Sequence, residues 1–239
     1  MVLAILQARM SSTRLPGKVM ADLAGAPMIL RQIERLDRTP GLGRIVVATS
    51  DQSSDDPLAR ALDGAGVAVF RGSLNDVLGR YIGALDAFGP AEVAVRLTAD
   101  CPLADPGVIE ATIALREATG ADYAANAGER RTFPKGLDVE VFRVEALRAA
   151  AAETRDPYDR EHVTPFLYRR PERFALAFHH QAVDEGDVRW TVDRPDDLDF
   201  VRAVYEALYP ETPAFTSDDV RAFVRRRPDL LTLGGDRRL

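Results

Sequence analysis

Cysteine is nearly absent from this 239-residue chain, and long apolar runs are absent altogether. Cys101 is the single cysteine, which excludes an internal disulfide and gives no indication of an oxidising compartment. No stretch approaches the roughly 18 apolar residues that a membrane span needs. The first residues show no basic segment followed by a long apolar one, so we expect no signal peptide. These absences predict a cytoplasmic protein without a membrane partner.

An excess of basic residues is also lacking. The chain has 31 basic and 37 acidic residues, a formal net charge of −6. Proteins that bind long nucleic acids are usually basic, so we expect no nucleic-acid partner. Apolar residues make up 46% and charged residues 28%, which is typical of a folded globular protein. The length suits one α/β domain, and we expect a single domain over 1–239 with a subsidiary element at about 127–180.

Apolar runs alternate with helical patterns through the first half of the chain. We expect strands at 2–6, 44–49, 67–70, 92–97 and 122–126, separated by helices at 27–36, 55–64, 73–88 and 106–119. This alternation is typical of a mostly parallel sheet with helices on both faces. The second half is less regular, with strands expected at 136–142, 174–179 and 188–192 and later helices starting near 196 and 217.

A polar loop, Arg9 to Lys18, follows the first strand directly. It carries three cations, three hydroxyl groups, one proline and one glycine. In an open parallel sheet, ligands bind beyond the carboxyl ends of the strands. Fixed positive charge and hydroxyl donors suit a polyphosphate, so we predict that this loop holds the triphosphate of a nucleotide. The alternative is a solvated basic turn. A Walker A motif is excluded because Val19, not serine or threonine, follows Lys18.

Two aspartates, Asp100 and Asp193, follow predicted strands, and each is followed two residues later by proline. Carboxylates at two strand ends can share one Mg²⁺, which prefers oxygen ligands and retains phosphate oxygens in its shell. The alternative is that each aspartate caps the helix after it. A polyphosphate loop at the same edge favours the metal interpretation, so Mg²⁺ is the predicted cofactor.

Acidic side chains in the second half indicate a place for a second substrate. Asp138 and Glu140 share one face of a predicted strand near Lys135, an arrangement that can grip a polyol carrying a carboxylate or form only a surface ion pair. The segment 159–162 is ambiguous in the same way. Cys101 has no histidine placed beside it by the sequence, so we expect an inert packed thiol.

Several of these stretches together resemble one family, the cytidylyltransferases that activate acidic sugars, and most closely its branch named after spore coat polysaccharide biosynthesis protein F. The resemblance covers about residues 2 to 208. It rests on the motifs at 5–18, 70–73, 96–103, 133–140, 160–164 and 189–193.

The resemblance implies a nucleotide-diphospho-sugar transferase fold, a Rossmann-like sheet with a small antiparallel dimerisation or substrate element, and a homodimer. It carries the metal role over to Asp100 and Asp193. The nucleotide-binding set that we predict is Ala8, Arg9, Ser11, Ser12, Arg14, Lys18, Arg71, Ser73 and Thr98. The predicted substrate-binding set is Lys135, Asp138, Glu140, Glu161 and His162.

The activity that the resemblance implies is transfer of CMP from CTP to a sugar, expected to be acidic, with release of pyrophosphate for surface polysaccharide or glycan synthesis. We expect Lys18, Arg9 and Arg14 to be the catalytic residues. Two alternatives stay open at this point. One is a glycosyltransferase that uses a nucleotide sugar, and the other is a non-catalytic module that binds a nucleotide or sugar.

Overall fold

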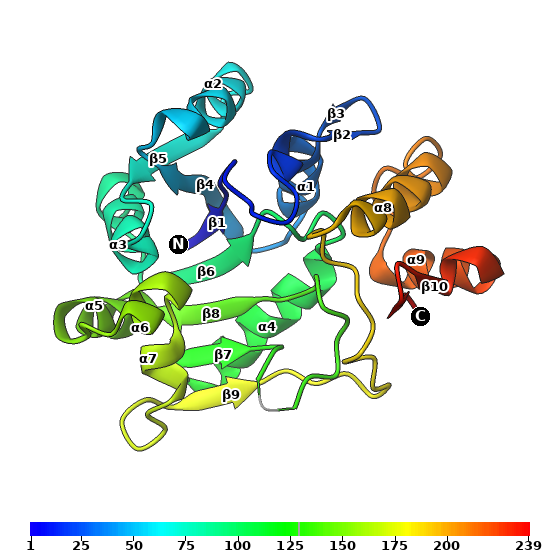
Figure 1. Ribbon diagram of the computed structural model, residues 1–239. Helices are drawn as coiled ribbons and strands as arrows, with labels where there is room; N and C mark the ends of the chain where they lie inside the picture. Colours follow the sequence, from blue (N-terminus) through cyan, green and yellow to red (C-terminus); the bar gives the residue numbers. More distant parts are fainter. Residues whose placement is uncertain (129) are drawn as a thin grey trace.

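A seven-stranded sheet in the order β5-β4-β1-β6-β8-β7-β9 forms the centre of the molecule (Figure 1). The computed structural model describes residues 1–128 and 130–239. The sheet strands are β1 (Val2–Gln7), β4 (Leu42–Ser50), β5 (Ala68–Gly72), β6 (Val93–Thr98), β7 (Tyr123–Ala125), β8 (Glu140–Arg143) and β9 (Leu176–Phe178). Two short hairpins pair β2 (Asp22–Leu23) with β3 (Ala26–Pro27) and β10 (Thr232–Leu233) with β11 (Asp236–Arg237).

The first half of the sheet is parallel, as the sequence predicted. β1 pairs in parallel with both β4 and β6, and β4 pairs in parallel with β5. β8 then runs antiparallel between β6 and β7. The predicted fifth strand, β7, is therefore not the neighbour of β6, because a later strand is inserted between them. The Rossmann-like α/β class is confirmed, and β8 and β9 of the region 127–180 belong to the main sheet.

Helices cover both faces of the sheet. β1 is buried on both sides, with Leu3 and Ile5 in one core and Ala4 and Leu6 in the other. One face packs against α3 (Val77–Phe88), α5 (Val144–Glu153) and α7 (Pro165–Tyr168), with α6 (Pro157–His162) beside α3. The other packs against α1 (Met28–Leu36), α2 (Asp56–Gly64) and α4 (Pro106–Thr119). A strand buried on two faces explains the unbroken apolar run at the start of the chain.

A third core lies outside the sheet and joins the last part of the chain to α1. It contains the fully buried Trp190 together with α8 (Pro195–Leu208) and α9 (Ser217–Arg225). Figure 1 shows these helices in orange, beside the C-terminal end of the chain. The short 3₁₀ helices are η1 (Lys18–Met20), η2 (Ser53–Asp55) and η3 (Pro228–Leu230).

Two sequence predictions of local structure were wrong. The segment 188–192 is no strand of the sheet, because its backbone N–H groups bond to three separate segments instead: Arg189 to the Arg237 carbonyl, Trp190 to Lys135 and Val192 to Asp100. The helix predicted to start at Ser73 starts four residues later. α3 begins at Val77, and Asp76 caps it by accepting a hydrogen bond from the Gly79 N–H at 2.9 Å. No helix in the described part of the chain is both long and apolar enough to cross a membrane.

Candidate active site

The site is built where β1 and β6 end side by side. Gln7, the last residue of β1, is paired with Thr98, the last residue of β6. The Ala99 N–H continues the ladder by donating to the Gln7 carbonyl at 2.9 Å. Because the strands are parallel, the loop after β1 and the loop carrying Asp100 leave the sheet at the same edge.

Gly17 lets the loop after β1 turn back toward the sheet. Its φ is +72°, in the left-handed region that favours glycine. The Gly17 N–H closes the loop by donating to the Met10 carbonyl at 2.9 Å. Met10 is itself held by the buried Asp55, whose Oδ1 accepts from the Met10 N–H at 2.7 Å. This turn starts η1 and places Lys18 at the sheet edge.

The ammonium group of Lys18 joins three segments that are far apart in the sequence. Its Nζ lies 2.6 Å from the Val192 carbonyl, 2.9 Å from Asp193 Oδ1 and 3.5 Å from Asp100 Oδ2. The Lys18 side chain is only 10% exposed. The two predicted metal-binding aspartates therefore converge on one cation, and all three side chains face the same cavity.

Asp193 is surrounded by positive charge. Its Oδ1 also lies 2.9 Å from an Arg14 guanidinium nitrogen, and its Oδ2 lies 2.8 Å from one of Arg189. Burial alone would raise the pKa of Asp193. The hydrogen bond and charge of Lys18, with those of Arg189 and Arg14, outweigh burial and hold that pKa below its usual value.

A cavity of about 350 Å³ opens over these groups. It contains most of the predicted nucleotide set and two of the predicted substrate residues. The described residues that line it are Gln7, Ala8, Arg9, Ser12, Thr13, Arg14, Lys18, Val19, Arg96, Thr98, Ala99, Asp100, Glu161, His162 and Asp193. Two of the lining side chains, Arg96 and Thr98, share one face at the end of β6, and Asp100 lies in the turn just beyond the strand.

Arg96 is a cavity residue that the sequence reasoning did not single out. It forms an ion pair with Glu140, which also accepts hydrogen bonds from Tyr123 at 2.7 Å and Thr164 at 2.5 Å. The attraction of Glu140 outweighs the desolvation of Arg96 and raises its pKa further. Arg96 Nε is buried without a partner. Glu140, predicted to contact substrate, thus holds a guanidinium at the wall of the cavity.

Six predicted site residues, Glu140 among them, are not among those that line the cavity. Arg71 bonds to the Ser50 and Gln52 carbonyls and pairs with Asp56. Asp138 pairs with Arg131. The others are Ser11, Ser73 and the exposed Lys135. Their predicted contacts with nucleotide or sugar stay predictions.

Magnesium fits the donor set that the cavity presents. Among the described residues, no three histidine, cysteine, aspartate or glutamate side chains gather as a metal site. Mg²⁺ does not require such a cluster, because one or two carboxylates plus phosphate oxygens and water suffice. The Lys18 ammonium already occupies a position between Asp100 and Asp193, within 3.5 Å of an oxygen of each, so the two carboxylates can share one positive charge. Cys101 nearby is no ligand candidate, since burial and the Asp100 charge raise the pKa of its thiol.

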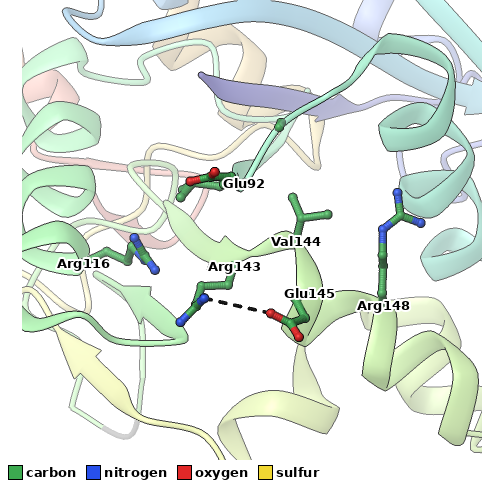
Figure 2. A pocket seen from close by; sticks show the side chains of 8 residues that line it. Glu92, Arg116, Arg143, Val144, Glu145 and Arg148 are labelled. Carbon is green, nitrogen blue, oxygen red and sulfur yellow. Dashed lines mark ion pairs between the residues drawn. The ribbon is translucent and has the colours of Figure 1, made fainter.

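A second cavity, of about 430 Å³, lies at the other end of the strands, where β6 begins at Val93. Figure 2 shows Arg116, Arg143 and Arg148 there together with Glu92 and Glu145. Arg143 and Glu145 form an ion pair at 3.9 Å, and both side chains are largely exposed. The charged side chains that line this second cavity are of both signs and are largely exposed. They do not converge on one group as those around Lys18 do.

The chain is similar over nearly its full length to known cytidylyltransferase-like proteins. It is 32% identical to the spore coat polysaccharide biosynthesis protein SpsF of Bacillus subtilis, covering 97% of each chain. It is 35% identical to a 3-deoxy-manno-octulosonate cytidylyltransferase of Mesorhizobium japonicum, covering 72% of this chain and 77% of that one. The solved structure of a cytidylyltransferase from Leptospira borgpetersenii superposes with a TM-score of 0.89 at 30% identity, covering 96% and 95%.

The profile that describes the family "Cytidylyltransferase" matches residues 3–208. That range contains the loop after β1, the end of β6 and Asp193, which are the segments that converge at the cavity. The chain belongs to the cytidylyltransferase family.

Proposed function

We propose that this enzyme transfers CMP from CTP to an acidic sugar and releases pyrophosphate, with Mg²⁺ as cofactor. The observation that carries the proposal is the meeting of Lys18, Asp100 and Asp193 beside Arg9 and Arg14 in one cavity. Two acids and several cations in one cavity suit a metal–triphosphate complex better than either component alone.

In the proposed reaction a sugar hydroxyl oxygen attacks the α-phosphorus of CTP. The new bond joins that oxygen to phosphorus, the bond from the α-phosphorus to the bridging oxygen breaks, its electron pair leaves with pyrophosphate, and the hydroxyl proton is released. Such transfers depend mainly on positioning and charge stabilisation. Bound between Asp100 and Asp193, Mg²⁺ would supply charge neutralisation and lower the pKa of the attacking hydroxyl.

The cations of the loop after β1 would stabilise the charge that grows on pyrophosphate. Arg14 is 61% exposed at its side chain, so it can turn from Asp193 to a phosphate without unpacking a core. Lys18 has three donors, and two of them now point to carboxylates. A metal cation that binds those carboxylates in place of Lys18 would free two Lys18 donors for phosphate oxygens. The bond to the Val192 carbonyl would still hold the Lys18 side chain in place.

We assign the sugar to the part of the cavity lined by Arg96, Glu161 and His162. The Arg96 guanidinium lines the cavity and pairs with Glu140 through one of its nitrogens, Nη1. A planar guanidinium suits a carboxylate, which supports an acidic sugar. The relative from Mesorhizobium is named for an eight-carbon acid of this kind.

Pyrophosphate release measured over four nucleotides and several sugars tests the proposal. We expect turnover with CTP and an eight- or nine-carbon sugar acid, and little with ATP, GTP or UTP. A matched sugar that lacks the carboxylate is the control. Release of a nucleoside diphosphate instead would indicate a glycosyltransferase and contradict the proposal. The predicted homodimer and cytoplasmic location are further proposals, tested by light scattering and by cell fractionation.

A further inference from the structure

Arg238, near the C-terminal end of the chain, is fully buried. Its guanidinium donates to Asp197 Oδ1 at 2.8 Å, to the Arg189 carbonyl at 2.8 Å and to the Leu233 carbonyl at 3.0 Å. Arg238 lies outside the range 3–208 that the family profile matches. A buried arginine with three acceptors is costly unless the surrounding fold holds every partner in place.

Asp197 is the fully buried partner that connects Arg238 to the site. Its Oδ2 accepts from the backbone N–H of Asp193 and of Arg194, each at 2.9 Å. Arg189 donates to both of its oxygens at 3.0 Å. Burial would raise the pKa of Asp197, but these donors together with Arg238 lower it well below its usual value. Asp197 is therefore ionised and fixes the backbone on which Asp193 stands.

Arg189 completes the connection from the buried pair to the cavity. The same guanidinium nitrogen that reaches Asp197 lies 2.8 Å from Asp193 Oδ2. This contact leaves Asp193 Oδ1 directed at Lys18. Main-chain contacts add to the arrangement, since the Arg189 N–H donates to the Arg237 carbonyl at 2.9 Å and Trp190 Nε1 donates to the Arg238 carbonyl at 2.8 Å.

We infer that Arg238 is a positioning residue for the metal-binding carboxylate of Asp193, acting through Asp197 and Arg189. The inference rests on the proposed metal role of Asp193. Without Arg238, Asp197 loses one of the two guanidinium groups that hydrogen-bond to it and keeps Arg189 and the more distant Arg194, at 3.6 Å, so Arg189 is drawn from Asp193 toward Asp197. The Asp193 carboxylate then loses the contact that holds its Oδ2, while Lys18 and Arg14 still hold Oδ1. Partners that orient metal ligands typically account for about 10–100-fold in metal affinity.

Calorimetric binding of CTP with and without Mg²⁺, in the absence of sugar, tests this without turnover. The measured quantity is the factor by which Mg²⁺ strengthens CTP binding, which reports the coupling between metal and nucleotide. We expect Arg238→Met to reduce this factor by about tenfold. Affinity for metal-free CTP should change by less than about threefold, because the cationic loop after β1 is untouched. A general loss of structure would weaken both affinities and leave their ratio unchanged.

Arg237→Met is the matched control. Arg237 is the neighbouring arginine, but its side chain is exposed and pairs with Asp187. We expect its Mg²⁺ factor to equal that of the wild type. Asp193→Asn should abolish most of the factor. If Asp193→Asn abolishes it but Arg238→Met preserves it, the inference is overturned and the metal proposal stands. If Mg²⁺ does not strengthen CTP binding to the wild type, both the positioning role of Arg238 and the proposed metal role of Asp193 are refuted.

Arg238→Lys keeps the test decisive if Arg238→Met does not fold. Lysine retains the charge beside Asp197 but lacks the planar fork that reaches the Arg189 carbonyl at the same time. We expect an Mg²⁺ factor between those of the wild type and Arg238→Met. A factor equal to that of the wild type in Arg238→Lys, with Arg238→Met unfolded, would refute the positioning role.

Discussion

Replacing Lys18 by methionine separates two effects of its ammonium group. In the free enzyme this cation sits between Asp193 and Asp100, at 2.9 and 3.5 Å, where the proposed metal would bind. In the reaction it would stabilise charge on the leaving pyrophosphate. Removing it should therefore strengthen Mg²⁺ binding to the nucleotide-free enzyme, because a competing cation is gone, while turnover falls.

The contacts of Lys18 set the size of the loss. A preorganised donor at a reacting group is worth about 10²–10³-fold in rate, or about 2.7–4 kcal/mol. The cost in stability should be smaller, about 1–3 kcal/mol for the lost charged hydrogen bonds. Asp193 retains Arg14 and Arg189, and the Asp100 side chain is 28% exposed and open to water. Methionine preserves the apolar length of the side chain in its packed slot.

Three measurements check this prediction. Pyrophosphate release gives the turnover, calorimetry gives Mg²⁺ affinity without nucleotide, and thermal unfolding gives stability. Arg225→Met, which removes an exposed cation from the last turn of α9, is the control and should change none of them. Turnover within threefold of the wild type, or weaker Mg²⁺ binding in Lys18→Met, would refute the reasoning.

Three further predictions follow from the same groups. Asp100→Asn should abolish activity together with the gain in CTP affinity from Mg²⁺, as calorimetry and pyrophosphate release would show. Arg96→Met should raise the KM for the sugar acid at least tenfold and that for CTP less than threefold, whereas a KM effect on CTP alone would contradict the sugar assignment. Asp197 has a lowered pKa in the folded protein, so its stabilisation is complete above the unfolded value near 3.8 and is lost as pH falls below it. Urea unfolding at pH 6 and pH 3 should thus show a smaller loss for Asp197→Asn than for the wild type.

The parallel half of the fold was predictable because its signals are local. The apolar run 2–6 by itself predicts a strand that is buried on both faces, as β1 is. The place of β8 was not predictable, since nothing in 140–143 specifies that it enters between β6 and β7. The segment 188–192 was wrongly predicted as a strand because its apolar pattern indicates burial but not where. Its apolar residues are buried in the third core rather than in the sheet.

The residues of the site also divide into those that the sequence could predict and those that it could not. Lys18, Asp100 and Asp193 could be proposed because each follows an expected strand and carries a chemical group suited to phosphate or metal. Arg96 and Asp55 could not, because their roles depend on partners distant in the sequence. Arg96 is paired with Glu140, 44 residues away, and Asp55 holds Met10, 45 residues away. The one available signal was the two-residue spacing of Arg96 and Thr98 at the end of the strand that precedes Asp100.

The site joins a rigid sheet edge to a separately packed core, and this division bears on how it works. Asp100 is attached to β6, whereas Asp193 belongs to the segment that packs with Trp190, α8 and α9. The connection between the two is short and polar: the Val192 N–H donates to the Asp100 carbonyl at 2.7 Å, and Lys18 bonds to both sides. Gly136 lets the third core approach, because a Cβ there would lie 2.6 Å from the Thr191 N atom. A shift of that core relative to the sheet would thus change the separation of the two carboxylates directly. Gly136→Ala, which forces such a shift, should therefore weaken the Mg²⁺-dependent part of CTP binding more than the metal-free part.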